Sequence, residues 1–195
     1  MKHSSIENLL EEDHASVSEL IAQLCVFLDE RDMKRAYPQL DLVWARLAVH
    51  IRAEHLCLFP AILDAARQIS IGEGSAPQLD EAQSALKQLR HDHDFFMVEL
   101  ARAVNLMRKL RASPASETLE KRLPELKQTI NAVKTRLENH NRLEEEQVYR
   151  WPAALLNTEQ QVEMVKGAQR ELENMPQRFA RSSQVNAMAS LNSGE

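Results

Sequence analysis

The stretch HIRAEHLCLFP, residues 50–60, holds two histidines and a glutamate immediately before an apolar run and a proline. His50 and Glu54 are four residues apart, so on a helix they lie one above the other on the same face. Leu47 and Leu58 extend that face in both directions, which indicates that it is turned toward the core. Ionisable side chains on a buried face need partners, and the rest of the chain must supply them.

The composition is typical of a single helical domain. The chain has 195 residues, of which 44% are hydrophobic and 27% charged, with only four glycines, and this length suffices for one sizeable core. The formal net charge of −5 does not indicate a nucleic-acid binder. Neither a signal segment nor a membrane-spanning stretch is apparent. We therefore expect a cytoplasmic location, with neither nucleic acid nor membrane as a partner, and the oligomeric state stays open.

Four long segments have apolar residues that recur with a period near 3.6 rather than 2, which predicts helices and no strands. The clearest loop between them is SIGEGSAP, residues 70–77. Pro38 suits the first turn of the second helix, whereas Pro60 lies inside an apolar pattern and predicts a kink or a stop. Long helices with modest connections predict an all-α fold, an antiparallel up-down-up-down four-helix bundle.

The C-terminal part of the chain has a different character. Thr158 to Gln161 forms a capping-box pattern, which predicts a short fifth helix to about Asn174 and a flexible tail after Pro176. We expect residues 1–165 to form the four-helix bundle and residues 166–195 to form the end of the last helix and the tail.

Each of the four long segments places a histidine on its inward stripe, and two add a glutamate one turn later. A single inward histidine is usually a satisfied core residue, and a single His–Glu pair can be a buried hydrogen bond. Four histidines and two glutamates cannot easily neutralise one another, because each buried carboxylate needs a cationic partner. Two metal ions supply that charge, and imidazole with carboxylate suits iron, manganese or zinc better than magnesium or calcium. The candidate ligands are His14, His50, Glu54, His93, His140 and Glu144.

Other polar residues are weaker candidates. His91 lies on a different face from the inward stripe and is expected to face solvent. His55 is expected at the edge of the stripe, where a contact with a ligand is the less favoured interpretation. Glu145 belongs to an acidic run expected to be solvated, although a contact with the site is left open. Cys25 and Cys57 lie far apart and are interpreted as packing residues rather than as a disulfide or thiolate ligands.

A ferritin-type di-iron site is the nearest alternative. That site needs Glu-x-x-His on two helices and a lone glutamate on each of the others. Here the spacing occurs once, from Glu11 to His14, whereas His-x-x-x-Glu occurs twice. The ferritin-type interpretation is therefore disfavoured.

The order of these motifs resembles the hemerythrin family, in its bacterial branch of HHE cation-binding domains. The matching motifs are Asp13-His14, His50 to Glu54 with Leu58-Phe59-Pro60 after it, Asp92-His93, and His140 to Glu145. The resemblance covers roughly residues 5–165 and implies a non-haem di-iron site in a four-helix bundle. It further implies that the two glutamates bridge the irons. His14 and His50 would ligate one iron, and His93 and His140 would ligate the other.

The chain departs from the oxygen-carrying hemerythrins at one position. Those proteins have a further histidine one turn after the third-helix histidine, where this chain has Met97. The departure implies a more open coordination sphere and argues against simple oxygen carriage. The resemblance then implies a protein that binds or senses oxygen, nitric oxide or peroxide. The alternatives are a di-iron enzyme that reduces peroxide or nitric oxide, and an iron-responsive interaction module.

Overall fold

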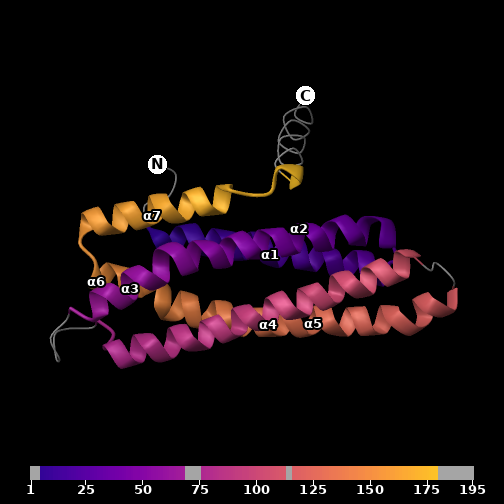
Figure 1. The fold of residues 1–195 in the computed structure, drawn as a ribbon, viewed down its shortest axis with the longest axis horizontal. Helices are drawn as coiled ribbons and strands as arrows, with labels where there is room; N and C mark the ends of the chain where they lie inside the picture. Colours follow the sequence, from indigo (N-terminus) through magenta and orange to yellow (C-terminus); the bar gives the residue numbers. More distant parts are fainter. Residues whose placement is uncertain (1–4, 69–75, 113–115, 180–195) are drawn as a thin grey trace.

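The computed structural model describes residues 5–68, 76–112 and 116–179, and every regular element in these ranges is a helix. The predicted all-α fold is thus confirmed for this part of the chain (Figure 1). None of the described helices has the length and hydropathy that crossing a membrane requires. The four longest helices are α1 (Ile6–Asp29), α2 (Met33–Ala53), α4 (Leu79–Ala112) and α5 (Ser116–Glu146).

The four long helices contact one another in a ring. Helices α1 and α2 pack together, α4 and α5 pack together, and the two pairs meet through contacts of α1 with α5 and of α2 with α4. Figure 1 shows the α1–α2 pair above the α4–α5 pair. The connection between α1 and α2 is only residues 30–32, where Arg31 has a positive φ of 58°, the left-handed conformation that commonly ends a helix.

Helix α2 begins earlier than its proline suggests. The side chain of Asp32 accepts a hydrogen bond from the backbone N–H of Arg35 at 3.0 Å, which satisfies one of the free donors of the first turn. The helix therefore starts at Met33, and Pro38 lies inside it. The prediction that Pro38 occupies the first turn was wrong, because the aspartate cap sets the start of the helix.

The helix continues through Pro60 by changing its geometry. Residues Glu54–Leu58 form a π-helical turn, η1, closed by the backbone N–H of Phe59, which donates to the carbonyl oxygen of Glu54. Helix α3 (Phe59–Ala66) follows, with Pro60 in its first turn, where the missing N–H costs little. The expected kink or stop is thus a widened turn, and π-helical turns are frequent at functional sites.

The C-terminal elements cover one side of the bundle. Helix α5 is followed by a 3₁₀ turn, η2 (Val148–Arg150), and by α6 (Trp151–Leu155). Helix α7 (Thr158–Glu173) then packs against α2, η1 and α1. The predicted fifth helix is confirmed, although Asn157 rather than Thr158 is its cap. Most of the predicted 70–77 loop and of the predicted tail lies outside the described residues.

Helix α7 approaches η1 closely at one glycine. A Cβ atom added to Gly167 would lie 3.1 Å from Sγ of Cys57, so the absent side chain lets the helix approach the widened turn. The Cys57 and Cys25 thiols are both free and half-buried, and burial raises the pKa of each.

Two hydrophobic clusters fill the interior, and each long helix crosses from one to the other at its inward histidine. The first cluster lies around Val17, Leu47, Phe96 and Leu137. The second lies around Leu10, Leu58, Leu89 and Val148. The four inward histidines lie along the chain between members of the two clusters. The histidines and glutamates therefore form a thin polar layer between two apolar ones.

Candidate metal centre

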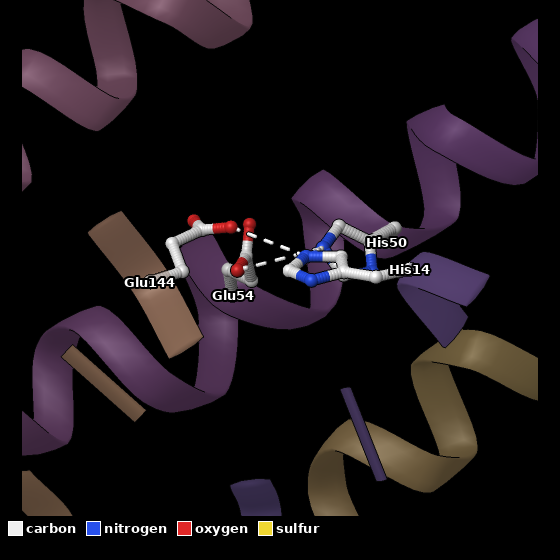
Figure 2. Close-up of side chains that lie close together, drawn as sticks. All are labelled: His14, His50, Glu54 and Glu144. Carbon is white, nitrogen blue, oxygen red and sulfur yellow. Dashed lines mark hydrogen bonds and ion pairs between the residues drawn. The ribbon is translucent and has the colours of Figure 1, made fainter. Parts of the chain in front are cut away.

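The structure brings all six predicted ligands together. Each is at most 4% exposed. Every long helix of the bundle contributes at least one of them, and Glu54 comes from the π-helical turn. They form two groups, and within each group the ligand atoms lie within 4.8 Å of one another. The groups are His14, His50, Glu54 and Glu144 (Figure 2), and Glu54, His93, His140 and Glu144.

The histidine nitrogens and carboxylate oxygens converge on two small volumes. The Nε2 atoms of His14 and His50 lie 3.2 Å apart, and those of His93 and His140 lie 3.1 Å apart. Since a metal ion binds nitrogen and oxygen ligands at about 2.0–2.2 Å, neighbouring donors around one ion are about 3 Å apart. The spacing of the imidazole pairs fits that geometry.

Two carboxylate oxygens in this layer lack hydrogen bonds. Oε2 of Glu54 and Oε1 of Glu144 are buried and have no hydrogen-bond partner. They lie 3.2 Å from Nε2 of His93 and 3.1 Å from Nε2 of His140, respectively, without making a hydrogen bond. An unsatisfied buried polar atom costs about 1–3 kcal/mol, and more when it is charged. A cation bound between carboxylate and imidazole would satisfy both oxygens, so the donor set fits a metal.

The directions of the pKa shifts in this polar layer show that its carboxylates favour positive charge beside them. Burial alone would raise the pKa of Glu54, but His50 and His93 outweigh it and hold that pKa well below its usual value. Burial and the charge of Glu54 raise the pKa of Glu144, yet His140 and other imidazole contacts lower it overall. Burial alone would lower the pKa values of His50 and His140, but the nearby carboxylates raise both.

Two aspartates orient two of the histidines. Nδ1 of His50 lies 2.9 Å from Oδ2 of Asp13, and Nδ1 of His140 lies 3.3 Å from Oδ2 of Asp92. A proton on Nδ1, donated to the carboxylate, leaves the Nε2 lone pair free for a metal. Each aspartate is held in turn by an arginine. The two chains of contacts are His50–Asp13–Arg46 and His140–Asp92–Arg136.

The other two histidines have different partners. Nδ1 of His14 lies 2.7 Å from Oε1 of Glu145, whose side chain is 39% exposed. Nδ1 of His93 lies 2.9 Å from Nε2 of half-buried His55. Burial and His93 lower the pKa of His55, which favours the neutral form that accepts a hydrogen bond. The contact left open for Glu145 thus exists, and the less favoured interpretation of His55 is the correct one. His91 is exposed, as predicted.

Tyr149 is the residue that sequence reasoning missed. Its side chain is 1% exposed, and its hydroxyl donates to Oε1 of Glu54 at 2.7 Å. Burial, together with the two glutamates, raises the pKa of the phenol well above its usual value. The residue follows Gln147, whose φ of −130° and ψ of −67° end the regular helix, and it is carried by η2. Helical spacing therefore could not place it.

Aromatic rings cover the second group. Phe96 is fully buried, with its ring centroid 6.5 Å from that of His93 and 5.2 Å from that of His140. Phe59 stacks on His93 at 6.0 Å, with 6° between the ring planes. Met97, which stands where the oxygen-carrying hemerythrins have a further histidine, is half-buried and packs against the first hydrophobic cluster. Phe96 is therefore the residue that lines the site one turn after His93.

Comparison with known proteins agrees with this geometry. The model of the hemerythrin HHE cation binding domain matches residues 5–152. No curated protein and no solved structure matches the chain. The matched range covers most of the chain, including all six predicted ligands as well as Tyr149. The chain therefore belongs to the family of hemerythrin HHE cation-binding domains.

Proposed function

We propose that the protein holds two non-haem iron ions and uses them to bind or sense a small ligand, such as oxygen, nitric oxide or peroxide. His14 and His50 would hold one ion, His93 and His140 the other, and both glutamates would reach both ions. One observation carries the proposal: two buried pairs of histidines share the same two buried carboxylates. A cytoplasmic location and a small-molecule partner remain expectations drawn from the sequence.

The donor chemistry favours iron. The layer offers imidazole nitrogens and carboxylate oxygens and, in the described residues, no thiolate in either ligand group. Such a mixed set suits iron, with manganese and zinc as less favoured occupants, whereas magnesium and calcium prefer oxygen alone. Iron, when bound, would supply open coordination positions and a change of oxidation state.

The protein's own side chains would define what reaches the site. All six ligands are at most 4% exposed, so only a small molecule can approach them without rearrangement of the helices. Phe59 and Phe96 cover the second group and exclude water from that side. Asp13 and Asp92 hold two imidazoles in the orientation that presents Nε2 inward.

We also propose that the four long helices form an antiparallel up-down-up-down bundle. The order of the two hydrophobic clusters along each helix supports this topology. Helix α1 runs from Leu10 of the second cluster to Val17 of the first, and α2 returns from Leu47 of the first to Ala53 of the second. Helices α4 and α5 repeat the same alternation. The short connection at residues 30–32 also requires α2 to turn back along α1.

Metal content and optical spectra test the function. Protein purified from iron-replete cells should contain two iron ions per chain, and its visible spectrum should change on exposure to air, nitric oxide or peroxide. No more than a trace of any transition metal would refute the proposal. Repeated turnover of peroxide or nitric oxide with an added reductant would instead identify an enzyme. Helicity that depends on iron would favour an interaction module.

A further inference from the structure

The hydroxyl of Tyr149 lies among the ligands of the first group. Its oxygen is 2.7 Å from Oε1 of Glu54, 3.2 Å from Oε2 of Glu144, 3.0 Å from Nε2 of His14 and 3.5 Å from Nε2 of His50. These four atoms belong to the four residues of one candidate site. The phenol therefore touches the whole of one ligand group.

Hydrogen bonding alone does not account for these contacts. A hydroxyl has one proton to donate and two lone pairs that accept, so it can make at most three of the four contacts as hydrogen bonds. The shortest contact is with Glu54. Nδ1 of His14 faces Glu145, and Nδ1 of His50 faces Asp13. With Nδ1 protonated toward those carboxylates, both Nε2 atoms turn lone pairs toward the phenol oxygen. The phenol oxygen and the two Nε2 atoms then converge with no proton between any two of them.

The same spacing is what one coordination sphere requires. The contacts of the phenol oxygen span 2.7–3.5 Å. The other neighbouring donors lie 3.2 Å apart for His14 and His50, 3.2 Å for His14 and Glu144, and 3.5 Å for His50 and Glu54. Donors that bind one ion at about 2.0–2.2 Å lie about 3 Å from their neighbours. All five atoms satisfy this condition.

We propose that Tyr149 is itself a metal ligand and that its phenolate oxygen completes the coordination of the ion held by His14 and His50. This inference rests on the proposed function. On loading, the ion takes the place of the phenolic proton, which is released to solvent. Tyrosinate is an established ligand for ferric iron in proteins. The second group has the ring of Phe96 beside its histidines, so the two ions differ in coordination.

The chain offers a matched control, because it contains only two tyrosines. The other one, Tyr37, is half-buried near the start of α2, and its ring lies under Arg111, with the guanidinium carbon 4.4 Å from the ring centroid. Ferric protein should be prepared with ordinary tyrosine and with ring-deuterated tyrosine, together with Tyr149→Phe and Tyr37→Phe. The measurements are iron content, visible absorption and resonance Raman scattering excited in the visible band.

We expect a tyrosinate-to-iron absorption band whose Raman ring modes shift on deuteration. The band should be lost completely in Tyr149→Phe and kept in Tyr37→Phe. Protein with two irons but without tyrosine modes would overturn the inference and leave the proposed function intact, whereas protein without iron would overturn both. If Tyr149→Phe does not fold, the deuterium shift in the unaltered chain, measured again in Tyr37→Phe, still decides the matter.

Discussion

The two ligand groups share both glutamates and differ in nearly everything around them. The His14–His50 group has the Tyr149 hydroxyl at its centre and two carboxylates, Glu145 and Asp13, behind its imidazoles. Among the described residues, no hydroxyl contacts His93 or His140 themselves. These two imidazoles have two phenylalanines as cover, and their Nδ1 atoms face one neutral imidazole and one carboxylate. One side is therefore richer in negative charge and oxygen, and the other is more apolar.

This difference teaches that a repeated sequence motif need not make a symmetric site. The two His-x-x-x-Glu motifs supply equivalent candidate ligands, but their surroundings come from elements that the motif does not include. An electron-rich environment favours a higher charge on the bound ion, whereas apolar surroundings favour a neutral diatomic molecule over a charged ligand. We therefore expect a small ligand to bind first at the ion held by His93 and His140.

Removal of a shared carboxylate should have the largest effect. Glu54→Ala should lose at least one of the two ions, because Glu54 belongs to both groups, and it also deprives Tyr149 of its acceptor. Breaking a buried charged pair costs about 3–5 kcal/mol, so the metal-free protein should be less stable as well. Elemental analysis and chemical denaturation measure the two effects. The control His91→Ala, at an exposed position, should change neither the metal content nor the stability. A Glu54→Ala protein that still binds both ions would show that the two ligand groups do not share this residue.

The pH dependence of the metal-free protein should oppose that of metal binding. The pKa values of His50 and His140 are raised above 6.5, so their contribution to stability is complete below that pH and is lost as the pH rises through the raised values. Those of Glu54 and Glu144 are lowered below 4.5, so their contribution is complete above 4.5 and is lost as the pH falls through the lowered values.

These four groups should thus contribute most to the stability of the metal-free chain between pH 4.5 and 6.5. Metal affinity should rise over the range above 6.5, because ligating imidazoles must be unprotonated. Chemical denaturation of chelator-treated protein across this pH range measures how stability depends on pH. Metal titrations at the same pH values measure how metal affinity depends on pH. Stability of the metal-free protein that increases above pH 6.5 would contradict the assignment.

Substitution of the two aspartates allows the affinity for each ion to be lowered separately. Asp13→Asn should lower affinity for the ion held by His50, and Asp92→Asn for the ion held by His140, each by about 10–100-fold. Stepwise metal titration of both variants measures the effect. If both variants weaken the same binding step equally, the two aspartates do not act on different ions, and the contrast between the two ligand groups is wrong.

Substitution of His55 should produce the smallest change in metal affinity. His55→Leu removes the acceptor for Nδ1 of His93. It should lower the affinity for the ion held by His93 and His140 by roughly tenfold, at the lower end of the range for partners of metal-binding histidines. His55→Gln keeps an acceptor and should restore most of the affinity. The first ion should bind unchanged in both variants, and the exposed His91→Ala is again the control. An equal loss in His55→Leu and His55→Gln would show a packing effect rather than a hydrogen bond.

Helical periodicity sufficed to predict that the six candidate ligands are buried and lie together, because each of them lies on a stripe whose apolar neighbours identify the buried face. It failed where the backbone leaves α-helical geometry. Tyr149 follows the break at Gln147, so a count from Glu144 points it in the wrong direction. His55 lies in a π-helical turn, where each residue advances by roughly 80° rather than about 100°, and this brings it closer to the face of Glu54. Local polar caps, such as Asp32, likewise outweighed the proline signal.

The π-helical turn also has a consequence for insertions and deletions. In an unbroken α-helix the nine steps from His50 to Phe59 would rotate by about 900°, which would set these two residues on opposite sides of the helix. The π-helical turn needs five residues for the rotation that an α-helix completes in four. This change places Phe59 where its ring stacks on that of His93, beside the site. The segment thus behaves as a helix with one residue inserted. A chain lacking one of residues 55–57 could revert to α geometry and keep His50, Glu54 and Phe59 on one side. A chain with one more residue there would turn Phe59 and Ile62, both fully buried, away from the core.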